Sequence, residues 1–175
     1  NFIHIQSKEK IFEGPTEKMS KSKKNVIEPN EILDNFGIDA TRIFMISDSP
    51  PDRELEWTDE GIQSSKNLTA RIERYFLKER SEIPNEVEKT VEKFIHEMEK
   101  NILSFSLNKC VANIYTLLNE LEKKKIFLYD DQLSKKVLTC LFPIIPSLSN
   151  SIYEQLFKVN IFKNLWPEVN LSLLE

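Results

Sequence analysis

Glycine is scarce in this sequence, with only 3 among 175 residues. Long stretches rich in Glu, Lys, Leu and Ile dominate instead, so the composition favours helices over sheet. Cysteine is almost as rare, and the two Cys residues, Cys110 and Cys140, lack the spacing of a metal site. Both lie in apolar helical patterns, which is typical of buried free thiols in a reducing cytosol. We expect a helical protein without a metal centre of its own.

Long hydrophobic runs are also missing. No apolar stretch approaches the roughly 20 residues that a membrane-spanning helix needs, and no charged-then-apolar leader opens the chain. Hydrophobic residues make up 40% and charged residues 30% of the sequence, as in ordinary soluble domains. We therefore expect a cytoplasmic monomer without membrane contact. Because the chain begins with Asn1 inside a strand-like pattern, we also expect a piece of a longer protein.

Charge is distributed unevenly along the chain. Residues 1–27 hold six Lys against three Glu, and residues 61–80 hold five Lys or Arg against two Glu. Between them, residues 28–60 hold ten acidic side chains against two Arg, and the whole chain has a net charge of -4. A protein that holds nucleic acid through general positive charge has a different profile. Any contact with RNA must therefore come from local basic stripes.

Apolar residues recur with helical spacing over most of the chain. They predict helices at residues 30–36, 39–48, 59–79, 86–102, 106–122, 130–141 and 148–157. Pro29 suits the first position of the first of these helices, and Asp39 is a candidate N-cap for the second. Residues 2–7 and 10–13 predict a short β-hairpin. The expected fold is mainly α, with amphipathic helices joined by short loops into an antiparallel bundle.

One basic stretch, Lys18-Met19-Ser20-Lys21-Ser22, differs from its surroundings. With Lys23 and Lys24 it places four ammonium groups within seven residues, without an acidic residue or an apolar period. Lysine ammonium groups, serine hydroxyls and the backbone N–H groups of such a loop suit phosphate oxygens. The residues alone predict a loop that grips a polyphosphate, although a solvated basic loop has the same composition.

The same stretch matches, letter for letter, the KMSKS signature of class I aminoacyl-tRNA synthetases. The resemblance implies that Lys18, Met19, Ser20, Lys21 and Ser22 bind ATP, which would carry Mg²⁺. It further implies that Lys21, and secondarily Lys18, stabilises charge on the leaving pyrophosphate while the aminoacyl-adenylate forms.

The similarity continues beyond the loop. The run from Lys18 to Gly61 resembles leucyl-tRNA synthetase of the bacterial type, and the block Ser49–Asp59, with Leu-Glu-Trp, distinguishes it from other class I enzymes. The resemblance implies an enzyme that joins leucine to tRNA-Leu with ATP. Residues 1–58 would end the catalytic domain and include a stem-contact region, and residues 59–175 would form the helical anticodon-binding domain. The resemblance is weaker after residue 61, where the family's Pro-His pattern is replaced by Pro146-Ser147.

Contacts with tRNA are expected from basic residues on the helices. Arg71, Arg74 and Lys78 lie at i, i+3 and i+7, so they share one face of the predicted helix 59–79. Arg42 and Arg53 are weaker candidates. Ordinary ion pairs within the helical bundle explain the same residues equally well.

Two alternatives to the leucyl enzyme remain at this point. Another class I synthetase, such as the isoleucyl or methionyl enzyme, shares the loop. A non-catalytic helical module that binds tRNA or protein would also fit the isolated 175 residues, which we expect to be inactive alone.

Overall fold

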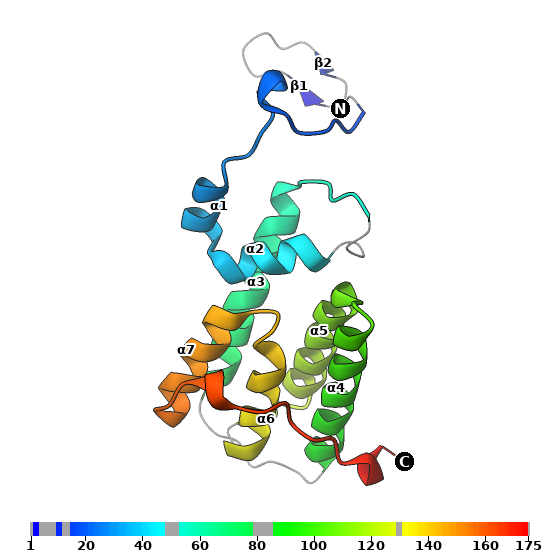
Figure 1. Ribbon diagram of the computed structural model, residues 1–175, viewed down its shortest axis with the longest axis vertical. Coiled ribbons are helices and arrows are strands. Elements are labelled where there is room, and N and C mark those ends of the chain that lie inside the picture. Colours follow the sequence, from blue (N-terminus) through cyan, green and yellow to red (C-terminus); the bar gives the residue numbers. More distant parts are fainter. Residues whose placement is uncertain are drawn as a thin grey trace.

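The computed structural model describes residues 2–3, 10–11, 15–47, 53–78, 86–128 and 131–174. Figure 1 shows an elongated molecule, with the described residues before Pro29 at one end and the α-helices filling the rest. Two short strands, β1 (Phe2–Ile3) and β2 (Lys10–Ile11), pair antiparallel, with Phe2 opposite Ile11. The residues that would complete the predicted hairpin, and part of the Ser49–Asp59 block, lie outside the described residues.

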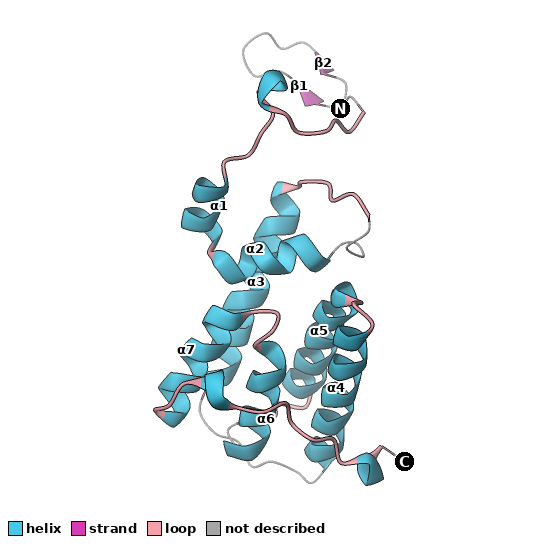
Figure 2. Ribbon diagram, viewed as in Figure 1, coloured by secondary structure: helices cyan, strands magenta, loops and turns pink. Residues whose placement is uncertain are grey.

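Helices dominate the rest of the described chain, as Figure 2 shows. The prediction of a mainly helical fold is therefore confirmed, and the helices begin and end within a few residues of their predicted positions. They are α1 (Pro29–Phe36), α2 (Ile38–Ser47), α3 (Asp59–Phe76), α4 (Glu86–Leu103), α5 (Leu107–Lys123), α6 (Asp131–Leu141) and α7 (Pro146–Phe157). Among them, no helix is long and apolar enough to cross a bilayer.

The core lies between α3, α4, α5, α6 and α7, where α4 packs against both α5 and α6, and Ile43 of α2 also belongs to it. The apolar stripes predicted from periodicity point into it, and Leu68, Ile95, Ile114 and Leu138 are almost completely buried. Both cysteines are free and buried in this core. Burial raises the pKa of Cys110 to about 11, so its thiol stays protonated at neutral pH.

The chain enters α3 through a tight local arrangement. The Thr58 hydroxyl accepts a hydrogen bond from the Gly61 N–H at 3.1 Å, which caps the helix. Trp57 packs against the ring of Phe44 on α2, with ring centroids 4.8 Å apart. A side chain at position 61 would meet both Thr58 and Phe44, since a Cβ there would lie 2.7 Å from the Phe44 ring. Glycine at this position therefore lets α3 approach α2.

Asp39 corrects one prediction from the sequence. The helix α2 begins before it, at Ile38, and the Asp39 side chain does not cap this helix. Its buried carboxylate instead accepts hydrogen bonds from the backbone N–H groups of Ser147 and Leu148, in the first turn of α7. The prediction failed because capping partners close in sequence are visible in a sequence, whereas a partner more than 100 residues away is not.

Residues 158–174, which we call the strap, cross the helices and lie in front of α6 and α4 in Figure 1. The strap contains two single turns, η2 (Ile161–Lys163) and η3 (Leu171–Leu173). Glu92 of α4 is completely buried beneath it, where its carboxylate binds the ammonium of Lys136 and accepts a hydrogen bond from the Asn170 N–H at 2.8 Å. This buried carboxylate joins α4, α6 and the strap.

Candidate functional site

The basic loop is built around a single turn of 3₁₀ helix, η1 (Lys21–Lys23). Ser20 precedes it in extended conformation, and its hydroxyl accepts a hydrogen bond from the Lys23 N–H at 3.4 Å. Lys24 ends the turn with a φ of 53°, in the left-handed region that side chains seldom occupy. The chain therefore reverses tightly and turns its lysine side chains outward.

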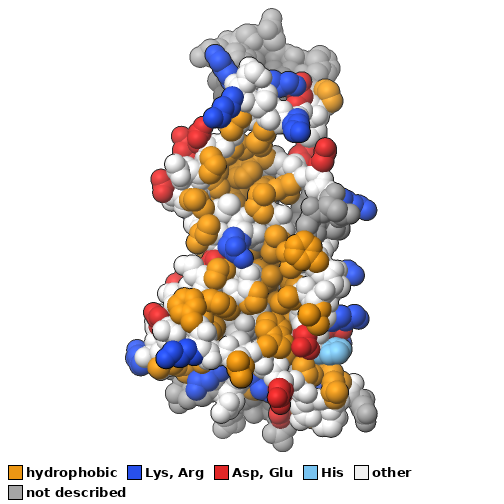
Figure 3. All heavy atoms as spheres, viewed as in Figure 1, with side chains coloured by type: hydrophobic (Ala, Val, Ile, Leu, Met, Phe, Trp, Pro, Cys, Tyr) orange, Lys and Arg blue, Asp and Glu red, His pale blue; other side chains and the backbone are white. Residues whose placement is uncertain are grey.

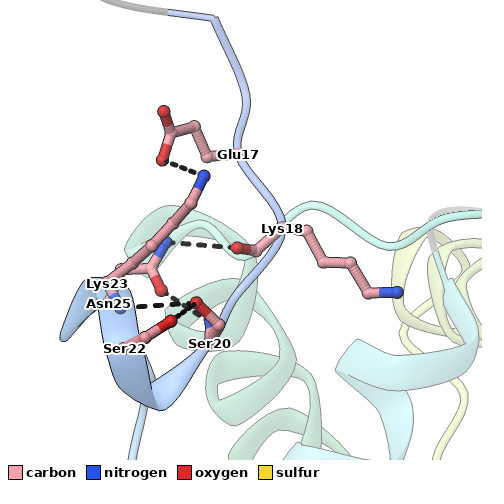
Figure 4. A network of polar contacts seen from close by, with 6 residues as sticks. All are labelled: Glu17, Lys18, Ser20, Ser22, Lys23 and Asn25. Carbon is pink, nitrogen blue, oxygen red and sulfur yellow. Dashed lines mark hydrogen bonds and ion pairs between the residues drawn. The ribbon is translucent and has the colours of Figure 1, made fainter.

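The side chain of Asn25 links the end of this turn to the backbone at its start. Its side-chain oxygen accepts a hydrogen bond from the Ser20 N–H at 2.8 Å, and its amide donates to the Lys18 carbonyl at 3.4 Å (Figure 4). The hydroxyl oxygens of Ser20 and Ser22 are 3.2 Å apart. Hydrogen bonds between its own polar groups therefore stabilise the shape of the loop, and the side chains of Ser20, Ser22 and Asn25 make these bonds.

The lysines of the loop differ in whether their ammonium group has a partner. The Lys23 ammonium pairs with the Glu17 carboxylate at 2.9 Å, and both side chains are exposed. Lys18, Lys21 and Lys24 are also exposed, and their ammonium groups have no hydrogen bond or ion pair with any described residue. Figure 4 shows the Lys18 side chain extending away from the polar network. Three ammonium groups are therefore available to an anion.

A hydrogen bond connects the residues just before the loop with the connector that leads into α3. The Thr16 hydroxyl donates to the Glu56 carboxylate at 2.9 Å, and Glu56 belongs to the connector that leads into α3. Sequence reasoning missed this contact, because 40 residues separate the two side chains.

The predicted tRNA-binding residues have different surroundings. Arg71 reaches across to α5, where it binds the Glu122 carboxylate at 2.8 Å and the Asn119 side chain at 2.7 Å. Arg42 donates to the carbonyl oxygens of Pro143 and Ile144. Both guanidinium groups thus help to hold the fold together.

The other three candidates remain at the surface. Arg74 and Arg53 are exposed, and their guanidinium groups make no hydrogen bond or ion pair with the described residues. Lys78 is exposed and lies over the ring of Phe127, 4.4 Å from its centroid. The predicted stripe on α3 is therefore divided: its first member is bound within the protein and its other two face solvent.

Comparison with known proteins now adds to this geometry. A family model described as tRNA synthetases class I (I, L, M and V) matches residues 2–58, which include the loop and its strands. A leucine–tRNA ligase of Zymomonas mobilis is 36% identical over 173 residues, covering 96% of this chain. One from Rickettsia prowazekii is 33% identical and covers 99% of it. The chain is therefore similar to a segment of these leucine–tRNA ligases.

This segment spans about a fifth of the length of these relatives, 20% of the first and 23% of the second. The fold of the segment is also similar to part of a larger solved structure. It superposes with a TM-score of 0.78 on a LeuRS from Agrobacterium radiobacter, whose crystal structure is described as a ternary LeuRS–tRNA–LeuAMS complex. The two chains share 23% identity, and the match covers 90% of this segment. This likeness concerns the fold.

Proposed function

We propose that the segment is part of a leucine–tRNA ligase, which attaches leucine to tRNA-Leu through leucyl-adenylate at the expense of ATP. Homology to leucine–tRNA ligases over nearly the whole chain carries this proposal, because it extends well beyond the loop that all class I relatives share. Cytoplasmic location and a monomeric state belong to the same proposal.

In this proposal the loop of residues 18–22 holds the triphosphate of ATP. Lys18 and Lys21 are exposed and unpaired among the described residues, so their ammonium groups can reach phosphate oxygens without first breaking an ion pair. Lys21 lies on the 3₁₀ turn itself and stabilises the charge that develops on pyrophosphate as the leucine carboxylate attacks the α-phosphate. Ser20 and Ser22 shape the turn, as their hydrogen bonds indicate.

The residues of the loop fit a phosphate rather than a metal ion. They offer ammonium, hydroxyl and N–H donors, and the carboxylate of Glu17, which directly precedes the loop in sequence, is paired with Lys23. Nor do the described ranges contain a group of three or more His, Cys, Asp or Glu that could hold a metal. Mg²⁺ would therefore enter bound to ATP, where it would neutralise phosphate charge.

The helical part takes the tRNA in this proposal. Residues 1–58 form the end of the catalytic domain, with α1 and α2 as the stem-contact region, and residues 59–175 form an anticodon-binding bundle. Arg74 and Lys78 are the members of the predicted stripe whose exposure suits a contact with RNA, and Arg53 is a further candidate. The likeness to the fold of a LeuRS that was crystallised with tRNA supports this assignment.

Replacement of Lys21 by Ala in the full-length ligase tests the catalytic proposal. We expect leucine-dependent ATP–pyrophosphate exchange to fall by about 10²-fold or more, because one stabilising charge is lost from the transition state. Lys23→Ala is a matched control, because Lys23 lies on the same turn but is paired with Glu17. It should retain most of the activity. Wild-type exchange by Lys21→Ala, at an unchanged melting temperature, would refute the role of Lys21.

A further inference from the structure

We propose that the segment binds the phosphate backbone of tRNA through a cationic cluster at one end of the helices, formed by Arg74, Lys78, Lys123 and Lys125. The cluster joins the end of α3 with the turn that follows α5. This inference rests on the proposed function, since it names a surface for the tRNA substrate. It differs from the stripe predicted from the sequence, because it excludes Arg71 and includes two lysines at the C-terminal end of α5, Lys123 and Lys125.

Three contacts bring the end of α3 and the turn after α5 together. The Tyr75 hydroxyl donates to the Ile126 carbonyl at 3.0 Å and accepts from the Leu128 N–H at 3.1 Å. Two residues beyond the end of α3, the Lys78 ammonium lies over the ring of Phe127. The side chains of Arg74 and Lys78 therefore reach the surface beside residues 123–127, although about 50 residues separate them in sequence.

Two acidic residues of α5 near this point are already neutralised by other cations. Glu122 binds Arg71, and Glu120 binds Lys124 at 3.0 Å. The hydrogen bond from Lys124 lowers the pKa of Glu120, which agrees with a paired carboxylate. Glu73 is exposed and precedes Arg74, but successive residues of a helix point about 100° apart. The four members of the cluster remain as exposed cations.

The backbone at Lys125 adds an independent observation. Its φ is 56°, and its N–H donates to the Glu122 carbonyl at 3.0 Å, so it occupies the left-handed position at the end of α5. Glycine is the residue usually found there, because any side chain costs about 1 kcal/mol in this conformation. A lysine at this position keeps a cation on the surface at the expense of local stability.

RNA is the partner that fits this cluster. Its members are flexible point charges and one guanidinium, spread over two elements, which suits a row of phosphates. Such contacts position a nucleic acid without reading its sequence, and they release counterions, so their contribution falls as salt rises.

The experiment measures the affinity of the full-length ligase for a tRNA-Leu transcript by filter binding over a range of salt concentrations. The variant is Lys123→Ala with Lys125→Gly. Glycine relieves the strained backbone at 125, so folding should be unharmed or improved. We expect binding to weaken about tenfold at physiological salt, with the slope of log affinity against log salt reduced by about one for each lost phosphate contact.

Lys109→Ala is the matched control. Lys109 is an exposed lysine near the start of the same helix, about 21 Å along the axis from Lys123. It should leave both the affinity and the salt slope unchanged. Leucine-dependent ATP–pyrophosphate exchange without tRNA should be unchanged in all variants, which shows that the catalytic part is intact.

Two results would overturn the inference, and they have different meanings. If the wild-type ligase binds tRNA-Leu and the double variant binds it equally well with the same salt slope, the cluster is not a tRNA surface, while the proposed function stands. If the wild-type ligase neither binds nor leucylates tRNA-Leu, the proposed function fails and the inference fails with it.

Discussion

The side chains of Asp39 and Arg42, one turn apart on α2, bind the same chain reversal between α6 and α7 from its two ends. Asp39 accepts hydrogen bonds from the N–H groups of Ser147 and Leu148, which have no partner within α7. Arg42 donates to the carbonyls of Pro143 and Ile144 at 2.8 and 3.0 Å. One helical turn of α2 thus satisfies both the donors and the acceptors of a distant reversal.

Asp39 should make the stability of the protein depend on pH. Burial is the largest influence on this carboxyl and raises its pKa above the ordinary value of 3.8, although the N–H groups of residues 148 and 147 oppose the shift. The native state then holds the proton more tightly than the unfolded chain does. Unfolding releases a proton in this pH range, so stability contributed by Asp39 falls as pH rises from about 4 through the native pKa.

The Asp39→Asn variant isolates this effect, because asparagine does not titrate. Urea unfolding from pH 3 to 7 gives the unfolding free energy of both proteins. The value for the wild type, relative to that for the variant, should decrease as pH rises and then become constant. Asp39→Ala should cost about 1–2 kcal/mol, as removal of a helix cap does. A wild-type advantage that grows with pH would contradict the predicted sign.

Much of the helical architecture could be predicted from the sequence, because it depends on local patterns. The spacing of residues such as Ile72, Ile95 and Ile114 placed them in the core, where they are almost completely buried. Pro29 indicated the start of α1 correctly. These features need only the neighbouring residues, so one sequence contains them.

The polar pairs that join the helices could not be predicted. Asp39 looked like a local cap, and Arg71 like one member of a surface stripe, yet each binds a partner on another helix. Glu92 is the one Glu or Lys of α4 that is buried, and nothing in the sequence distinguishes it from the other charged residues of that helix. Periodicity indicates which face is apolar, but it does not tell which charged residue meets which partner. In the loop, sequence identified the lysines, and only the structure shows that Lys23 is paired with Glu17.

Arg71 should contribute more to stability than to tRNA binding. Its guanidinium binds Glu122 and Asn119 of α5, and the Glu122 side chain is 38% exposed, so solvent screens the pair. We expect Arg71→Met to lower the unfolding free energy by about 0.5–1 kcal/mol, measured by urea unfolding. Arg74→Met, at an exposed position on the same helix, should leave stability within about 0.5 kcal/mol of wild type. Equal stability of the two variants would show that the contact with α5 is inconsequential.

Gly61 should tolerate no side chain. A Cβ at this position would lie 2.6 Å from the Thr58 hydroxyl oxygen and 2.7 Å from the Phe44 ring, and both groups are held by other contacts. Gly61→Ala should therefore destabilise the protein by about 1–3 kcal/mol, although alanine normally stabilises a helix interior. Ala70→Gly, at an exposed position in the same helix, calibrates the ordinary difference between the two residues. The measurement is the melting temperature of each variant in thermal unfolding. A higher melting temperature for Gly61→Ala than for wild type would contradict the prediction, since it would show that α2 and α3 can move apart at little cost.

Glu92 and Lys136 should be strongly coupled in their effect on stability. Glu92 is completely buried, so replacing Lys136 by Met leaves a buried carboxylate without its cation, which costs about 3–5 kcal/mol. Glu92→Leu should also be costly, because it leaves Lys136 and the Asn170 N–H without their acceptor. In the double variant Glu92→Leu/Lys136→Met neither charge remains, so most of the loss should be recovered. About 1–2 kcal/mol would remain for the unpaired Asn170 N–H. Urea unfolding of the four proteins gives the coupling energy directly, and if the two single losses simply add, the pair does not depend on mutual neutralisation.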